Sequence, residues 1–118
     1  MELLEERIRK REEVLKKAAE YASSLDYSCS VFLFGSYARG DFNLWSDVDI
    51  IIVSDFDKNI KKRFDALDFP PGFEVIPMRP EELLGSGPRK NFFLDSIRKD
   101  LVMLRDDLQF QDKLRVLR

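Results

Sequence analysis

The chain has 118 residues, with 20 basic and 22 acidic side chains, no histidine and one cysteine. This length is typical of one domain, and the net charge of −2 excludes the basic field that holds proteins along nucleic acid. Without histidine there can be no Ser-His-Asp or Cys-His relay, and Cys29 alone forms neither a disulfide nor a cysteine metal cluster. An enzyme of this composition must work with carboxylates, cations, hydroxyls and backbone amides.

The composition also bears on where the protein works. The N-terminal segment MELLEERIRKREE is too charged for a secretory signal, and no apolar run approaches the ~20 residues that span a membrane. A single cysteine gives no sign of an oxidising compartment. We therefore predict one domain, residues 1–118, in the cytoplasm and without a membrane partner.

The first half of the chain predicts one helix and two strands. Residues 2–25 have helical apolar spacing, with the stripe Leu4, Ile8, Leu15, Ala18, Ala22 and Leu25. The basic run at residues 7–11 is a candidate nucleic-acid patch, but the glutamates that flank it favour a solvated helix face. Residues 30–34 and 48–53 are continuous apolar runs, which predict strands buried on both faces.

The second half predicts a further alternation of helices and strands. A helix is expected over 57–67, with Ile60, Phe64 and Leu67 on one face, and a strand over 73–76 that Pro77 ends. There follow a short helix at 80–84, a loop at 85–88, a helix at 91–99, a strand at 101–104 and a helix at 106–117. This order predicts an α/β fold in which helices pack on a small mixed sheet.

The stretch FGSYARGDFNLWSDVDIIIV, residues 34–53, carries the most chemical information. Asp47 and Asp49 lie two residues apart at the start of an apolar strand, so their side chains project to one face. Their like charges repel unless a cation lies between them, and Mg²⁺ binds one or two carboxylates together with phosphate oxygens. The alternative is that Asp47 caps a turn and Asp49 faces water.

Gly35 and Ser36 lie between the first apolar strand and the loop. A glycine at the end of a buried strand lets backbone N–H groups turn toward an anion, and a serine adds a hydroxyl donor. Gly-Ser is common at turns, but here ten residues separate it from Asp47. The combination predicts an anion cradle beside a cation site, which suits a nucleoside triphosphate carrying Mg²⁺.

These residues resemble the DNA polymerase β-like nucleotidyltransferase superfamily. The form here looks most like the minimal nucleotidyltransferase branch, whose short members carry G-S-x-A-R-G followed by S-D-x-D. The similarity extends more loosely over residues 10–105. It implies a nucleotidyltransferase fold, with Gly35 and Ser36 at the triphosphate and Asp47 and Asp49 at the metal.

The family also uses a third carboxylate on a later strand, for which Glu74 is the best candidate in this chain. Apolar residues flank Glu74 in its predicted strand, where an acid is otherwise costly. The family often has aspartate there, so the longer glutamate is a departure, and an edge-strand glutamate that faces water is the alternative. Arg39 matches the arginine of A-R-G, and it would either neutralise phosphate or pair with Asp41 or Asp47.

Two aromatic residues of the loop, Tyr37 and Trp45, are expected to pack on the core, with stacking on a nucleobase as the alternative.

The resemblance implies transfer of a nucleoside monophosphate, AMP from ATP, to a hydroxyl group. Two Mg²⁺ ions would be held by Asp47, Asp49 and Glu74, and Glu74 would accept the hydroxyl proton. Members of the branch are often encoded beside a small helical HEPN protein, so the resemblance further implies an antitoxin that modifies such a partner, or a homo-oligomer. The alternatives are an antitoxin that masks its partner without turnover, and transfer to a small molecule.

Overall fold

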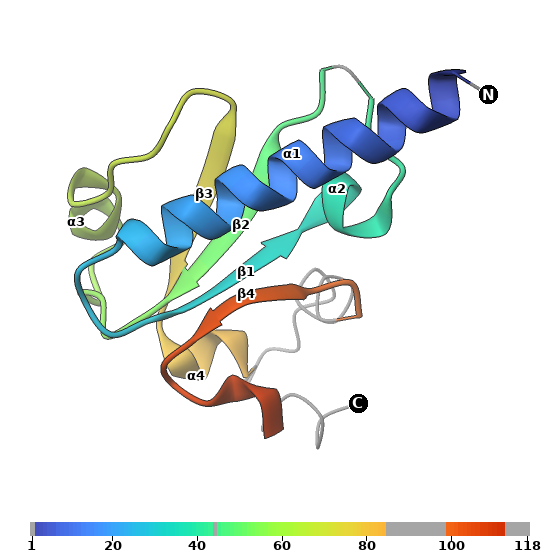
Figure 1. Ribbon diagram of the computed structural model, residues 1–118. Coiled ribbons are helices and arrows are strands. Elements are labelled where there is room, and N and C mark those ends of the chain that lie inside the picture. The colour runs from blue at the N-terminus through green and yellow to red at the C-terminus, as the bar shows by residue number, and fades with distance from the viewer. Residues whose placement is uncertain (1, 44, 85–98, 113–118) are drawn as a thin grey trace.

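The computed structural model describes residues 2–43, 45–84 and 99–112. Within these ranges the chain alternates between helices and strands, as the sequence predicts (Figure 1). The elements are α1 (Glu2–Ser24), β1 (Ser30–Phe34), α2 (Gly35–Arg39), β2 (Val48–Val53), α3 (Ile60–Asp65), β3 (Phe73–Met78), α4 (Pro80–Leu83) and β4 (Val102–Asp106). None of the helices in the described ranges is both long and apolar enough to cross a membrane.

The described strands form one mixed sheet in the order β3-β2-β1-β4. β1 runs antiparallel to both β2 and β4, whereas β2 and β3 are parallel. All five residues of β1 are buried, and in β2 only Asp49 is not fully buried. The prediction of two strands covered on both faces is therefore confirmed, and so is the α/β class.

Each face of the sheet has its own apolar core. On one face α1 lies across the strands and packs Val14, Ala18 and Ala22 against side chains such as Leu33 and Ile50 (Figure 1). The other core consists of Phe32, Phe34, Ile51, Val53, Leu83 and Phe110. Two buried layers on either side of β1 and β2 explain why these strands read as continuous apolar runs.

Only part of the predicted apolar stripe of α1 is buried. The N-terminal turns of α1 extend past the sheet (Figure 1), and there Leu4 and Ile8 are 59% and 52% exposed. The periodicity correctly predicts the helix. It does not show where the neighbouring sheet ends, because a helix has the same spacing whether or not a partner covers it.

Two predicted boundaries near the outer strands are wrong. β3 continues through Pro77 to Met78, and Pro77 aligns with Ile52 of β2. An outer strand tolerates proline, since half of its N–H groups point away from the sheet. Asp106 ends β4 and does not start a helix; its carboxylate accepts hydrogen bonds from the Ser30 hydroxyl at 2.8 Å and from the N–H of Phe110 at 2.8 Å.

The helix predicted over residues 57–67 is shorter than expected. It begins at Ile60, because the Asn59 side chain accepts a hydrogen bond from the N–H of Lys62 at 3.1 Å and caps it. The expected apolar face is wrong for Ile60 and Phe64, which are exposed while Arg63 is buried, and right for Leu67, which packs against the core. The predicted loop 85–88, the predicted helix as far as residue 98, and residues 113–117 lie outside the described residues.

Candidate active site

The sheet topology brings three segments of the motif together at one end. The carboxyl end of β1 meets the start of β2, where Phe34 aligns with Asp49, and Asp49 in turn aligns with Glu74 of β3. Residues aligned on neighbouring strands project to the same face. Asp49 shares the face of Ile51 and Val53, so both carboxyl groups lie on the side of the sheet opposite α1. The structure thus brings Asp49 and Glu74 together.

Gly35 is in direct contact with Asp49. Its φ angle is +76°, and a Cβ atom at this position would lie 2.1 Å from Oδ2 of Asp49. Every other residue would meet both the strain of the left-handed backbone and a clash with the carboxylate. Gly35 therefore places the backbone at the start of α2 against the Asp49 carboxyl group.

α2 follows β1 without a linker and presents its first turn beside that carboxyl group. Phe34 is the N-cap residue, and no side chain caps the first N–H groups of α2 in the described structure. The first N–H groups of a helix have no partners within the helix, so they are available to an anion. Ser36, half-buried in this turn, adds its hydroxyl to the same place.

The Asp49 carboxyl group has a pKa raised from its usual 3.8 to about 6. Burial is the largest cause, followed by the negative charges of Glu74 and Asp47 and a hydrogen bond with Glu74; Arg39 acts in the opposite direction. A positive charge beside these groups would favour the ionised form. At this site the negative charges of the chain repel one another, and a bound cation would reduce that repulsion.

Arg39 forms an ion pair with Asp41, and not with Asp47. Its Nε lies 3.1 Å from Oδ2 of Asp41, and both side chains are largely exposed. The charge of Arg39 also lowers the pKa of Asp49. It thus acts electrostatically on the carboxylates from the end of α2.

The resemblance implies a divalent metal, for which Asp47, Asp49 and Glu74 are the candidate ligands. Asp47 and Glu74 are exposed, and no three Asp, Glu, His or Cys side chains of the described residues are gathered closely enough to hold a metal ion. The adjacent pair Asp49 and Glu74 nevertheless offers hard oxygen ligands, and Mg²⁺ is commonly held by one or two carboxylates together with substrate phosphates. The donor set therefore fits one Mg²⁺ completed by a nucleotide, and the two-metal arrangement stays a prediction.

Hydrogen bonds join described residues of the loop before Asp47. The Asn43 side chain accepts a hydrogen bond from the N–H of Trp45 at 2.8 Å, and the Ser46 hydroxyl accepts one from the N–H of Asn43 at 2.9 Å. Asn43 and Ser46 therefore close the turn, and the alternative role of Asp47 as a turn cap receives no support. The expected packing of Tyr37 on the core is confirmed, but that of Trp45 is wrong, since Trp45 is 89% exposed.

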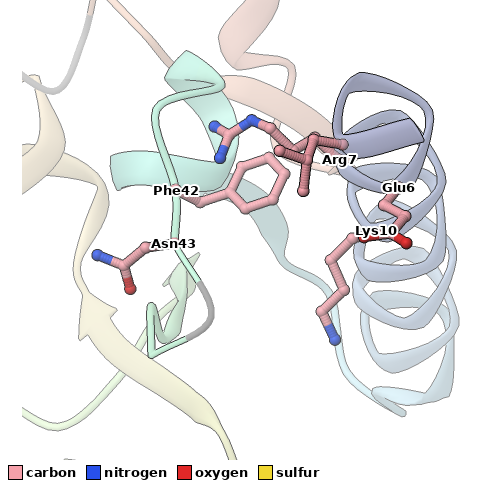
Figure 2. Close-up of a pocket in the computed structure, with 6 residues that line it drawn as sticks. Glu6, Arg7, Lys10, Phe42 and Asn43 are labelled. Atoms are coloured by element: carbon pink, nitrogen blue, oxygen red, sulfur yellow. The ribbon is translucent and has the colours of Figure 1, made fainter. Parts of the chain in front are cut away.

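A cavity of about 310 Å³ lies on the α1 side of this loop (Figure 2). It is lined by Leu3, Glu6, Arg7, Lys10, Phe42 and Asn43. None of the candidate carboxylates lines this cavity, so it is separate from the site on the opposite face of the sheet.

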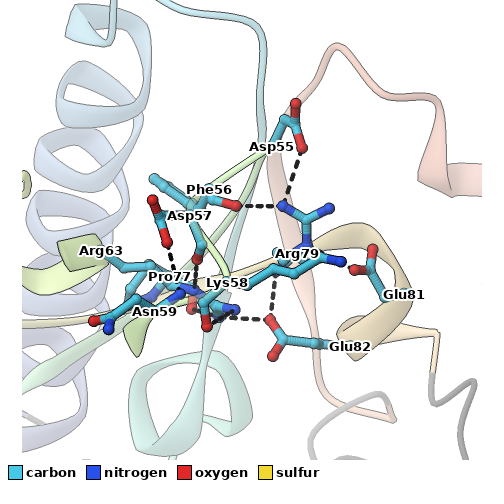
Figure 3. Close-up of polar contacts among 10 residues, drawn as sticks. All are labelled: Asp55, Phe56, Asp57, Lys58, Asn59, Arg63, Pro77, Arg79, Glu81 and Glu82. Carbon is cyan, nitrogen blue, oxygen red and sulfur yellow. Dashed lines mark hydrogen bonds and ion pairs between the residues drawn. The ribbon is translucent and has the colours of Figure 1, made fainter. Parts of the chain in front are cut away.

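A second polar cluster, at the other end of β2 and β3, is a competing candidate (Figure 3). At its centre the Arg63 side chain, 5% exposed, pairs with Glu82 at 2.6 Å and donates to the backbone carbonyls of Asp57 and Pro77. Arg79 pairs with Asp55 and Glu81 and donates to the carbonyl of Phe56. The charges satisfy one another, so the cluster joins α3, β3 and α4 and serves the fold.

Comparisons with known proteins concern the family of the chain. Over 27 residues the chain is 63% identical to a Methanocaldococcus jannaschii protein that carries the provisional name protein adenylyltransferase. That match covers 23% of this chain and only 27% of the relative. A crystal structure of a provisionally assigned nucleotidyltransferase from Sulfolobus solfataricus superimposes with a TM-score of 0.58 at 27% identity, covering 82% of this chain and 84% of the other.

The family model described as a nucleotidyltransferase domain matches residues 15–116. This range contains the whole motif, from Gly35 to Glu74, and most of the chain. The chain therefore belongs to the nucleotidyltransferase domain family.

Proposed function

We propose that the chain transfers AMP from ATP to a hydroxyl group of a protein in a Mg²⁺-dependent reaction. The observation that carries this proposal is the contact of Gly35 with Asp49, which sets the uncapped first turn of α2 beside a carboxylate pair. An anion cradle next to paired carboxylates suits a triphosphate and its cation. The match to a nucleotidyltransferase domain supports nucleotidyl transfer in general.

In the proposed reaction each residue of the site has a separate task. The backbone N–H groups at Gly35 and Ser36 and the Ser36 hydroxyl bind the triphosphate, and Arg39 adds a positive charge. Asp49 and Glu74, with Asp47 as a third ligand, would hold the metal, and a metal bound there would neutralise phosphate charge and lower the pKa of the acceptor hydroxyl. The acceptor oxygen attacks the α-phosphorus, the bond from that phosphorus to the β-phosphate oxygen breaks, and pyrophosphate leaves. Glu74 takes the hydroxyl proton.

A protein acceptor is the finer part of the proposal. The name of the Methanocaldococcus jannaschii relative refers to adenylyl transfer to protein, and its matched segment is 63% identical. We further propose, from the resemblance to the minimal branch, that the acceptor is a small helical HEPN-type protein and that the chain acts as its antitoxin. The test below also distinguishes two alternative functions, masking of this partner by binding alone and modification of a small molecule.

The test combines the full chain, Mg²⁺, ATP and the protein encoded by the neighbouring reading frame. Intact mass spectrometry should show a gain of one AMP on the partner, lost when EDTA replaces Mg²⁺ and in Asp49→Asn. Asp65→Asn, which changes an exposed aspartate of α3, is the matched control and should retain transfer. A stable complex with no AMP gain would favour masking, whereas AMP on a small molecule alone would overturn the protein acceptor.

A further inference from the structure

The short helix α2 depends on contacts with other elements for its stability and position. It has five residues, and a single turn in water is unfavourable, because nucleation fixes several dihedral angles for one hydrogen bond. Its carboxyl end leaves backbone carbonyls without helical partners. Tyr37 packs on the core and Gly35 at the start of α2 touches Asp49, so the support of the far end of α2 contributes to how the triphosphate turn meets the carboxylates.

That support comes from α1, a helix far away in the sequence. The Arg11 Nε–H donates to the carbonyl of Tyr37 at 2.9 Å, and its Nη2 donates to the carbonyl of Ala38 at 3.3 Å. Arg7, one helical turn earlier, donates to the carbonyl of Gly40 at 3.0 Å. Two guanidinium groups thus bind the carboxyl end of α2, where positive charge is also favoured by the helix dipole.

An aromatic stack makes a second connection between the same elements. The guanidinium of Arg7 lies over the Phe42 ring, 4.6 Å from its centroid (Figure 2). Phe42 in turn stacks on Tyr37 of α2, with centroids 4.4 Å apart and planes at 19°. Arg7 therefore touches both the end of α2 and the loop that leads to Asp47.

We propose that Arg11, assisted by Arg7, is a positioning residue for nucleotidyl transfer, which sets the Gly35-Ser36 turn against Asp49 from the opposite end of α2. This inference rests on the proposed role of that turn in binding the triphosphate. The proposed role also explains why two of the basic residues of α1 lie where they do. Arg7 and Arg11 are four residues apart and share a helix face, whereas Arg9 lies on another face.

The experiment measures binding of ATP with Mg²⁺ by calorimetry to the full chain and three variants. Arg11→Gln should weaken binding about tenfold, as supporting residues of a site commonly do when removed. Arg11→Lys keeps the charge but not the planar fork, so it should recover only part of the affinity. Arg9→Gln removes the same charge from an exposed position of the same helix and should leave affinity within about twofold.

A double-mutant cycle with Ser36→Ala separates positioning from a general loss of stability. If Arg11 acts through α2, the double variant should bind only slightly more weakly than the weaker single variant, because the two changes disrupt one unit. Additive losses would overturn the proposal, as would unchanged affinity in Arg11→Gln with a lowered melting temperature. If Arg11→Gln does not fold, Arg7→Gln in the same cycle gives the answer. If the wild-type chain does not bind ATP, both the proposed function and this inference are overturned. If the wild type binds ATP and the Arg11 variants bind it with the same affinity, the inference alone is overturned.

Discussion

Replacing Asp49 by asparagine should make the protein more stable while it removes nucleotidyl transfer. In the folded chain the pKa of Asp49 is about 6, against 3.8 in an exposed carboxyl group. The difference of about 2 units corresponds to about 3 kcal/mol at 1.36 kcal/mol per unit. Asp49 is only half-buried, so solvent screening reduces this figure, and we expect about 1–2 kcal/mol.

The effect has a defined dependence on pH. Because the folded chain holds the Asp49 proton more tightly than the unfolded chain, stability falls as the pH rises from about 4 to about 6 and stays reduced above that. Asparagine has the same shape and no charge to lose. The gain in the free energy of unfolding should therefore be close to zero near pH 4 and complete above about pH 7.

Urea denaturation of the wild type, Asp49→Asn and the control Asp65→Asn, each at several pH values, checks this expectation. Only Asp49→Asn should show a gain that grows with pH. Equal stability at all pH values, or a loss that is largest at high pH, would refute the view that burial and the neighbouring negative charges raise the pKa of Asp49. Retained transfer at the wild-type rate would refute its assigned role in the reaction.

Three further predictions concern other parts of the molecule. Gly35→Ala should cost at least about 2 kcal/mol in urea unfolding and abolish ATP binding, because φ is +76° and the new Cβ would clash with Asp49; wild-type stability would contradict this. Arg63→Met should lower stability by about 2–3 kcal/mol in thermal unfolding, with ATP affinity unchanged, since it removes the ion pair with Glu82 and the hydrogen bonds to the carbonyls of Asp57 and Pro77 at the far end of the sheet. Trp45→Ala should change the free energy of unfolding by under ~0.5 kcal/mol, because the indole is 89% exposed; a larger loss would show that it packs on the protein.

The parts of the fold that sequence reasoning predicts well are those set by burial on both sides. The apolar runs of β1 and β2 have no polar alternation because each face has its own core. The family resemblance also predicted Glu74 as the third carboxylate. The parallel register of β2 and β3 is what shows that Glu74 aligns with Asp49. Residue spacing predicts which side chains share one face of a strand. It does not predict which residue lies opposite on the next strand, because that register depends on the whole topology.

The errors arise where a side chain forms hydrogen bonds with groups in other segments of the chain. Arg63 looks like a solvated position of α3, yet it is buried, because carbonyls of Asp57 and Pro77 and the carboxylate of Glu82 converge on it from separate segments. Asp106 looks like a helix start, yet its carboxylate accepts from Ser30, 76 residues away in the chain. Such partners have no local signal, since hydrogen bonds across the fold leave no periodicity.

Opposite charges are paired at one end of the sheet and like charges lie together at the other end, and this contrast links folding to function. At one end Arg63 and Glu82 are paired within the protein, so the charges lower the free energy of the folded chain without a ligand. At the other end Asp49 faces Glu74 and Asp47, charges of its own sign, and Arg39 acts in the opposite direction. A ligand that brings positive charge stabilises the chain most where its side chains repel, and Gly35, with its left-handed backbone, lies at the same place. Stability and nucleotide binding are therefore coupled at this end, and a substitution that improves one should weaken the other.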